Sequence, residues 1–325
     1  MKKSTKVWLL IATVLLLAGC ILFAVVMTKL DWDFKKLSTR EYKTNTHAVT
    51  DSFRHISITA DTANINFALS EDGTISVVCH EDVNFQHTVT VEDNTLVIEA
   101  TKSHKWYHYV GIGFESSAIT VYLPAGEYGD LTVRATTGDV YFPIYYTFDS
   151  MDVKVTTGDI FSFAGVVGTA KIRATTGDVG LKAFEAGSLD VSVSTGDISV
   201  KNVSTDDLRL SVTTGKTAVK GVRCRNFTSV GTTGDILMRD LLVDDALFIE
   251  RDTGDVSFDA CDAGSMKITT DTGDVLGTLL TQKVFVTHTD TGNVRLPHTA
   301  PSGGPCEITT DTGNIHITLD HSESE

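Results

Sequence analysis

The sequence predicts an all-β protein, a β-solenoid of 19–20-residue rungs that follows a single membrane-spanning helix. Three observations support this prediction. A Thr-Gly pair recurs ten times at nearly constant spacing, β-branched residues alternate with other residues on both sides of each pair, and one uncharged apolar segment precedes the repeats. A motif repeated at a fixed period indicates a repeat architecture, in which each unit packs on its neighbours.

The apolar segment is residues 7–27, which contain no charged side chain. About 20 apolar residues span a bilayer as a helix. Lys2, Lys3 and Lys6 precede the segment, and positive charge is retained on the cytoplasmic side. We therefore expect a cytoplasmic tail at 1–6, a transmembrane signal anchor at 7–28 and a polar stalk at 29–52, with the rest of the chain extracytoplasmic.

An alternative for the N-terminus is lipidation. Leu17-Ala18-Gly19-Cys20 resembles the lipobox of bacterial lipoproteins, in which the cysteine is acylated after cleavage. The residues that follow, ILFAVVM, are apolar, whereas mature lipoproteins usually continue in polar residues. This favours the anchor, and both alternatives place the remaining chain outside a membrane.

The charge of the exported part is strongly negative. Residues 31–325 carry 23 Lys and Arg against all 42 Asp and Glu, a formal balance of −19. Such a surface repels nucleic acid and anionic lipid. The four cysteines beyond the apolar segment match no zinc-binding spacing and are too sparse for a disulfide scaffold.

The repeats are aligned on the glycine of each Thr-Gly pair, taken as position 0. The glycines are separated by 19 to 21 residues, and the residue at −1 is Thr in all ten copies. Position +1 is Asp in seven copies, Asn in two and Lys once, at Lys216. Position −2 is Thr or Ser in six copies and Asp in the last four. These four residues predict a tight corner, with glycine at the place where a type II turn needs positive φ.

The flanks of the corners predict strands. Val or Ile occupies +2 in nine copies, with Thr217 the exception, and positions −7, −5 and −3 of the second copy are apolar, at Met151, Val153 and Val155. A meander of hairpins and a solenoid both fit this pattern. We favour the solenoid, with each rung directly over the last, because a fixed rung length is required when every coil advances by one strand spacing. Residues 131–320 would form the regular array, and 53–130 irregular N-terminal rungs or a cap.

The string of S/T-T-G-D-V/I corners and the segment ITVYLPAGEYGDLTVRATTGDV, residues 119–140, resemble the DUF4097 family of putative adhesins, bacterial proteins with β-strand repeats. The resemblance covers residues 50–320, and an anchored N-terminus also suits the family. It implies a β-helix-like stack, in agreement with the period, but little mechanism, because the biochemical activity of the family is poorly defined.

Acidic columns along the corners are a candidate cation site. In a solenoid the +1 and −2 positions of the last rungs would stack, and hard cations such as Ca²⁺ bind carboxylate oxygens. The alternative is that these oxygens only cap the turns, as Thr does in other rungs. The candidate ligands are Asp252, Asp255, Asp271, Asp274, Asp290 and Asp311. No other cofactor is expected.

Two further surfaces are candidates for binding. Position +5 is basic in four successive rungs and could hold a phosphate-rich polymer or be a solvated strand face, at Lys182, Lys201, Lys220 and Arg239. Aromatic residues gather near the start of the array, where they could contact a partner or pack in the cap, at Trp106, Tyr107, Tyr109, Phe114, Tyr141 and Phe161.

The sequence contains no GxSxG, P-loop or dinucleotide-binding fingerprint. We therefore expect a membrane-anchored, non-enzymatic, adhesin-like or interaction scaffold at the bacterial cell surface. The alternatives are an accessory or sensor protein of an envelope-stress system that contacts a membrane partner, and a polysaccharide-active β-helix enzyme.

Overall fold

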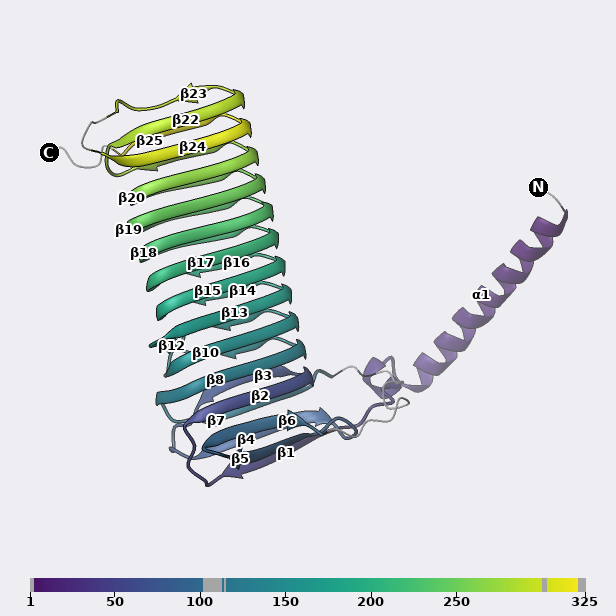
Figure 1. Ribbon diagram of the computed structural model, residues 1–325. Helices are drawn as coiled ribbons and strands as arrows, with labels where there is room; N and C mark the ends of the chain where they lie inside the picture. Colours follow the sequence, from purple (N-terminus) through teal and green to yellow (C-terminus); the bar gives the residue numbers. More distant parts are fainter. Residues whose placement is uncertain (1–2, 102–112, 114, 300–302, 321–325) are drawn as a thin grey trace.

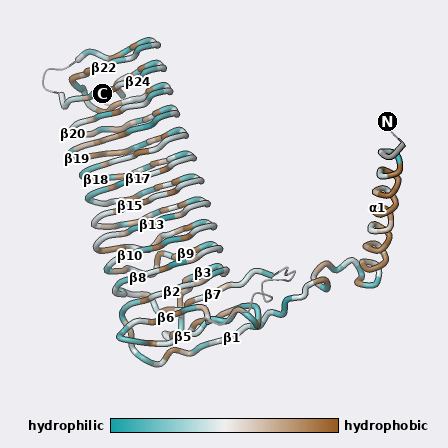
Figure 2. The backbone as a smooth tube through the Cα atoms, turned by 45° about the vertical axis from the view of Figure 1, so that its right-hand side comes forward, coloured by the Kyte–Doolittle hydropathy of each residue, from teal (hydrophilic) through white to brown (hydrophobic). Residues whose placement is uncertain are grey.

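The computed structural model describes residues 3–101, 113, 115–299 and 303–320. β-Strands make up most of it, and their inward and outward side chains alternate as predicted. Figure 1 shows the strands stacked as rungs of a straight rod, with a helix extending from the end that holds the first strands. The chain begins with α1 (Lys3–Lys29), followed by a 3₁₀ turn η1 (Phe34–Leu37). Figure 2 shows α1 as a continuous hydrophobic segment, in contrast to the alternating rungs.

Each regular rung has a long limb before the Thr-Gly corner and a short limb after it. The long limbs pair with one another in parallel, and so do the short limbs, so the rod has two main faces. The long limbs are β8 (Gly126–Thr137), β10 (Tyr146–Thr157), β13 (Thr169–Thr176), β15 (Glu185–Thr195) and β17 (Ser204–Thr214). The short limbs are β9 (Val140–Phe142), β11 (Ile160–Ser162), β14 (Val179–Lys182) and β16 (Ile198–Lys201), and a short β12 (Gly165–Val166) lies beside β10.

Further along the rod, one strand runs from each corner to the next and includes both limbs. These strands are β18 (Thr217–Thr233), β19 (Ile236–Thr253) and β20 (Val256–Thr272). The parallel ladder continues through them, and Thr214, Thr233, Thr253 and Thr272 face one another in sequence. A shift in register beside Val243 accommodates the one extra residue of the β19 rung. The predicted solenoid is therefore confirmed.

The interior of the rod is filled by the columns that the alternation predicts. The residues at −7, −5 and −3 of the long limb and at +2 and +4 of the short limb point inward and are buried, for example Leu189, Val191, Val193, Ile198 and Val200. They belong to one hydrophobic cluster that extends along the rod. Each rung buries its apolar face only between neighbouring rungs, which is why stacking stabilises the fold.

The first rung has Ala63 in the place of the corner glycine, after Thr62, which pairs with Thr137. It consists of β2 (His55–Thr62) and β3 (Asn64–Leu69), which pair in parallel with β8 and β9. Below it the pattern changes to a mixed cap that includes antiparallel pairs β1–β4, β4–β7 and β5–β6. The cap strands are β1 (Tyr42–Val49), β4 (Ile75–Asp82), β5 (His87–Glu92), β6 (Thr95–Ala100) and β7 (Ala118–Leu123).

The predicted polar stalk at 29–52 is wrong in its second half. Residues 42–49 form β1, which pairs along its whole length with β4 from Tyr42↔Asp82 to Val49↔Ile75. The segment is polar because neither face of this edge strand is fully buried. The polar composition suggested a linker, whereas β1 covers the end of the stack. Edge strands of this kind are often polar.

The far end departs from sequential stacking. Its strands are β21 (Val275–Leu279), β22 (Lys283–Thr291), β23 (Val294–Arg295), β24 (Gly304–Thr312) and β25 (Ile315–Leu319). β24 pairs with β20 on one side and β22 on the other, and β25 likewise lies between β21 and β23. The last rung in sequence thus lies between the two rungs before it. The expectation that every rung lies directly over the last is wrong here. The rung that ends the stack is that of β22, which has Thr287 and Thr289 at two inward positions and, among the described residues, is paired on one side only.

Candidate functional site

The Thr-Gly-Asp corners form a ladder of side-chain hydrogen bonds along one edge of the rod. Each +1 carboxylate accepts a hydrogen bond at Oδ1 from the backbone N–H of the +1 residue one rung further on. The distances are 2.9 Å from Asp159 to Asp139, and 2.8 Å both from Asp178 to Asp159 and from Asp197 to Asp178. The Asp at +1 therefore acts between rungs, whereas the sequence predicted a cap within its own turn.

The ladder also explains the substitutions at +1. Asn64 and Asn314 supply amide oxygens in the same role, to Asp139 N–H at 3.0 Å and Asn293 N–H at 3.0 Å. The backbone N–H of Lys216 donates a hydrogen bond to Asp197 Oδ1 at 2.7 Å, but the Lys216 side chain has no acceptor for the N–H of Asp235. Lys216 Nζ instead lies 3.8 Å from Asp235 Oδ2. The ladder is interrupted at this one rung of the regular array.

The corner glycines are required for two reasons, of which the sequence predicted one. Nine of the ten have positive φ, between 131° and 159°. These values exceed the φ of about 80° at the third place of a type II turn, so that turn type was wrong although positive φ was right. In addition, a Cβ on Gly177 would lie 2.1 Å from the carbonyl oxygen of Gly158 in the adjacent rung. Any side chain here would force the rungs apart.

The carboxylates predicted to hold a cation are arranged along this same edge. Asp255 and Asp274 are members of the ladder, at 2.8 Å between Asp255 Oδ1 and Asp274 N. Asp290 contacts His288 Nε2 at 2.9 Å. In the part of the chain that the structure describes, no group of three or more His, Cys, Asp or Glu side chains is placed to hold a metal ion. A calcium site at Asp252, Asp255, Asp271, Asp274, Asp290 and Asp311 stays an untested prediction.

A polar cluster inside the rod was missed by the sequence reasoning. Arg251 is 2% exposed, and its guanidinium donates to Ser229 Oγ at 2.9 Å and Thr217 Oγ1 at 3.2 Å. Gly231 leaves the space, because a Cβ there would lie within contact of Arg251 Nη1. Burial lowers the pKa of Arg251 to about 10. Several signals were visible in the sequence, namely Thr217 at +2, Ser229 at −5, and Gly231 and Arg251 at −3, all of them inward positions of the repeat.

The basic column is formed in the structure as predicted by its spacing. Lys182 faces Lys201, Lys201 faces Lys220, and Lys220 faces Arg239 in the parallel register of the short limbs. All four side chains are exposed. Arg239 Nε lies 3.1 Å from Asp259 Oδ2. For Lys182, Lys201 and Lys220, no carboxylate of the described residues lies within 4.0 Å of the ammonium group.

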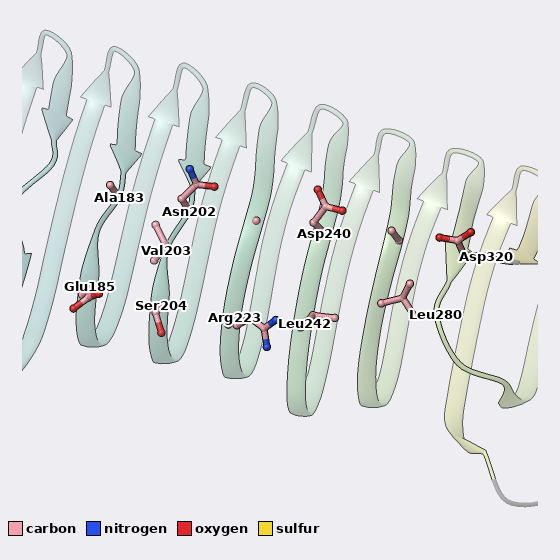
Figure 3. A pocket seen from close by; sticks show the side chains of 12 residues that line it. Ala183, Glu185, Asn202, Val203, Ser204, Arg223, Asp240, Leu242, Leu280 and Asp320 are labelled. Atoms are coloured by element: carbon pink, nitrogen blue, oxygen red, sulfur yellow. The ribbon is translucent and has the colours of Figure 1, made fainter. Parts of the chain in front are cut away.

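A groove of about 710 Å³ runs along the rungs next to this column. Figure 3 shows that the side chains lining it come from successive rungs along the rod. The residue after each of the four basic residues, and after Asp259 in the next rung, bends the chain in the left-handed region, with φ between 50° and 63°. These bends are at Ala183, Asn202, Gly221, Asp240 and Ala260. Glu185, Ser204, Arg223 and Leu242 line the groove beyond the bends.

The aromatic candidates fall into two groups. Trp106, Tyr107, Tyr109 and Phe114 lie outside the described residues. Tyr141 and Phe161 are outward neighbours on β9 and β11, and 41% and 42% of their surfaces are exposed. Phe67, Phe142, Tyr146 and Phe148 are buried together at the start of the array, with ring centroids 4.9 to 6.4 Å apart. These four rings therefore pack in the core, whereas Tyr141 and Phe161 lie on the surface.

The cysteines are buried in the apolar columns, except Cys20. Burial raises the pKa of Cys79, Cys224 and Cys306 to about 12 and that of Cys261 to about 11. Such thiols are inert at neutral pH. Cys20 lies within α1, whose segment Thr5–Lys29 is long and apolar enough to cross a membrane. An N-terminal helix of this kind suggests a membrane anchor or a signal sequence, and acylation of Cys20 stays an untested alternative.

Comparison with solved structures finds proteins of the same architecture at low identity. A putative adhesin from Parabacteroides distasonis ATCC 8503 is 13% identical, with a TM-score of 0.51 over 73% of this chain and 98% of that one. A putative adhesin from Bacteroides fragilis NCTC 9343 is 14% identical, with a TM-score of 0.41 over 86% and 97% of the two chains. A putative lipid binding protein from Parabacteroides distasonis ATCC 8503 is 13% identical, with a TM-score of 0.47 over 72% and 96%.

No curated protein matches the chain. The profile of the family described as Toastrack DUF4097 matches residues 53–239 and 186–325, which together cover every rung and most of the cap. This match agrees with the corners and the stacked rungs described above. The chain belongs to the Toastrack DUF4097 family.

Proposed function

We propose that the protein is a membrane-anchored extracytoplasmic rod that acts as a non-enzymatic, adhesin-like interaction scaffold. The observation that carries this proposal is the continuity of the stack, in which the repeated residues are engaged in the fold itself. The corner carboxylates bond the next rung, and the inward columns are buried. A rod built in this way has long lateral faces, which are available for binding and lie at a fixed distance from the point of attachment.

The N-terminal helix supports attachment to a membrane. Its apolar segment, Thr5–Lys29, reaches a mean hydropathy of 3.0. Lys2, Lys3 and Lys6 at its start favour a cytoplasmic N-terminus. The rod would then extend outward, with the cap near the membrane and the exchanged last rungs at the free end. Eleven rungs at about 4.8 Å per strand spacing span roughly 50 Å.

The experiment compares cells that display the full chain with cells that display residues 1–41 alone. The proposal predicts that only the full chain promotes retention of cells on envelope-coated surfaces under flow. A variant that lacks one whole rung keeps the fold but shortens the rod, so it should retain most of this effect. Equal retention with and without the rod would overturn the proposal. Capture of a single membrane signalling protein in the absence of any adhesion would instead favour the accessory or sensor alternative.

A further inference from the structure

The side chains of Lys182, Lys201 and Lys220 form a row of free positive charges on a strongly acidic protein. The row lies on neighbouring parallel strands, so its members are about 4.8 Å apart. At this spacing, adjacent ammonium groups repel by about 1 kcal/mol in water. The two arginines of the opposite face differ, because Arg134 and Arg173 share Asp152 as a counter-ion.

The row stands between two tracks of small residues. The outward neighbours on one side, at +3, are Gly180, Ser199 and Ala218, in the same register as the lysines. On the other side, the left-handed bends at Ala183, Asn202 and Gly221 line the groove, and Figure 3 labels Ala183 and Asn202 on neighbouring rungs. The ring of Phe161 lies over Gly180 at the Lys182 end of the row. The small side chains at Ser199, Ala218 and Ala183 leave the lysines accessible, so an extended chain can lie along the rod and reach all three.

The charges of the groove restrict where an anionic ligand would lie. Glu185, Asp240 and Asp320 line it together with Arg223. Anionic groups are therefore favoured at the lysine row and disfavoured deeper in the groove. Hydroxyl or other neutral linking groups can contact Asn202 and Ser204, whose side chains offer hydrogen-bonding atoms.

We propose that the lysine row and its adjoining groove bind a linear polymer that carries phosphate groups at short regular intervals. Lysine is a compact point charge that binds phosphate without demanding a planar partner. No two lysines converge on one pocket, so a single phosphate gains little, whereas a polymer engages one lysine on each of three rungs. This assignment rests on the proposed function and deepens it, because it names the ligand of one face of the scaffold.

The test uses the full chain in an uncharged detergent and inorganic polyphosphate of about twenty units as the probe. Binding is followed by isothermal calorimetry, with orthophosphate in a separate arm. The variant Lys182→Gln/Lys201→Gln/Lys220→Gln removes the row. The matched control Lys43→Gln/Lys154→Gln/Lys171→Gln removes three exposed lysines elsewhere on the rod, with the same change in net charge.

The proposal predicts that polyphosphate binds and orthophosphate does not. The row variant should bind at least about 10-fold more weakly, and the control variant should change affinity by less than about 3-fold. Because three phosphates release their counter-ions, raising salt from 50 to 150 mM should weaken wild-type binding by about 10-fold. Absence of polyphosphate binding, or equal loss in both variants, would overturn the proposal. Adhesion that persists in that case would leave the scaffold function standing.

Discussion

The carboxylate of Asp178 accepts a hydrogen bond of 2.8 Å from the backbone N–H of Asp197, which is 19 residues later in the chain and one rung further along the rod. This contact gives the most frequent residue at +1 a defined role. It satisfies a corner N–H that the neighbouring strand does not reach, and it links successive rungs at the edge where they turn.

The ladder predicts that the +1 side chain stabilises the fold through its acceptor oxygen more than through its negative charge. Asp178→Ala should lower the free energy of unfolding by about 0.5–1.5 kcal/mol, because Asp197 N–H loses its partner. Asp178→Asn keeps an acceptor oxygen, as at Asn64 and Asn314, and should be close to neutral. Lys216→Asn should raise the free energy of unfolding by about 0.5–1.5 kcal/mol, because its amide oxygen can accept a hydrogen bond from Asp235 N–H and complete the ladder. Denaturant unfolding of the full chain measures all three, and equal effects of Ala and Asn would contradict this role.

The period predicts that a whole rung can be removed. Deletion of residues 178–196 joins Gly177 to Asp197 and brings Asp197 N–H over Asp159, so every ladder contact can re-form. Deletion of residues 178–187 removes about half a rung and cannot preserve the inward columns. Circular dichroism and limited proteolysis should show a folded β protein for the first deletion and loss of the strand signal for the second. Loss of fold in both would argue against equivalent rungs.

The cluster around Arg251 predicts opposite effects of partial and complete replacement. Ser229→Val leaves a buried guanidinium N–H without its 2.9 Å acceptor and should destabilise by about 1–3 kcal/mol. The combined variant Thr217→Ile/Ser229→Val/Arg251→Val replaces the cluster by apolar side chains. Gly231 is kept, because a Cβ there would lie 2.7 Å from the carbonyl oxygen of Val212. Replacement of a buried charge by apolar residues is often neutral or stabilising, so this variant should unfold at or above the wild-type temperature. A combined variant less stable than Ser229→Val would contradict the prediction.

The acidic edge predicts a response to ionic strength that is not specific to calcium. Asp255 and Asp274 already accept hydrogen bonds at Oδ1, Asp274 from Asn314 N–H at 2.7 Å. Screening weakens repulsion between the exposed carboxylates, so calcium and sodium at equal ionic strength should give the same melting temperature. A rise specific to calcium that is lost in Asp271→Asn/Asp274→Asn would contradict this prediction and support a cation site.

The regular part of the fold was predictable because one residue pattern repeats with a fixed period. Corners, limbs and inward columns follow from Thr-Gly, from Val and Ile at +2, and from alternation. The order of the last two rungs was not predictable, because Gly292 and Gly313 occur in nearly the same context and either rung can stack on Gly273. β1 was missed because an edge strand with two half-exposed faces carries no apolar alternation.

The candidate sites were predictable to different degrees. The basic column follows from the position of Lys182, Lys201 and Lys220 in the repeat, but the groove beside it depends on left-handed bends at residues as different as Ala183 and Asn202. The contact of Arg251 with Ser229 depends on which positions face each other across rungs. That relation requires the register of the stack, and Thr217 alone does not reveal it.

The most direct test of the account asks whether the rod lies outside an intact cell. The variant Ser194→Cys places one thiol at an exposed corner position, whereas Cys79, Cys224, Cys261 and Cys306 are buried. Burial raises the pKa of these native thiols to about 11 or 12, so they are protonated near pH 7 and would become thiolates only as the pH rises toward those values. Because Cys20 on α1 is exposed, the variant is made in a Cys20→Ala chain, and the Cys20→Ala chain without the added thiol serves as the background control.

The measurement is labelling of unbroken cells at pH 7 with a maleimide that cannot cross membranes. The account predicts that Ser194→Cys in the Cys20→Ala chain is labelled to the same extent before and after the cells are lysed, and that the Cys20→Ala chain alone is labelled in neither case. Labelling of Ser194→Cys only after lysis would place the rod on the cytoplasmic side and contradict its role as a surface scaffold.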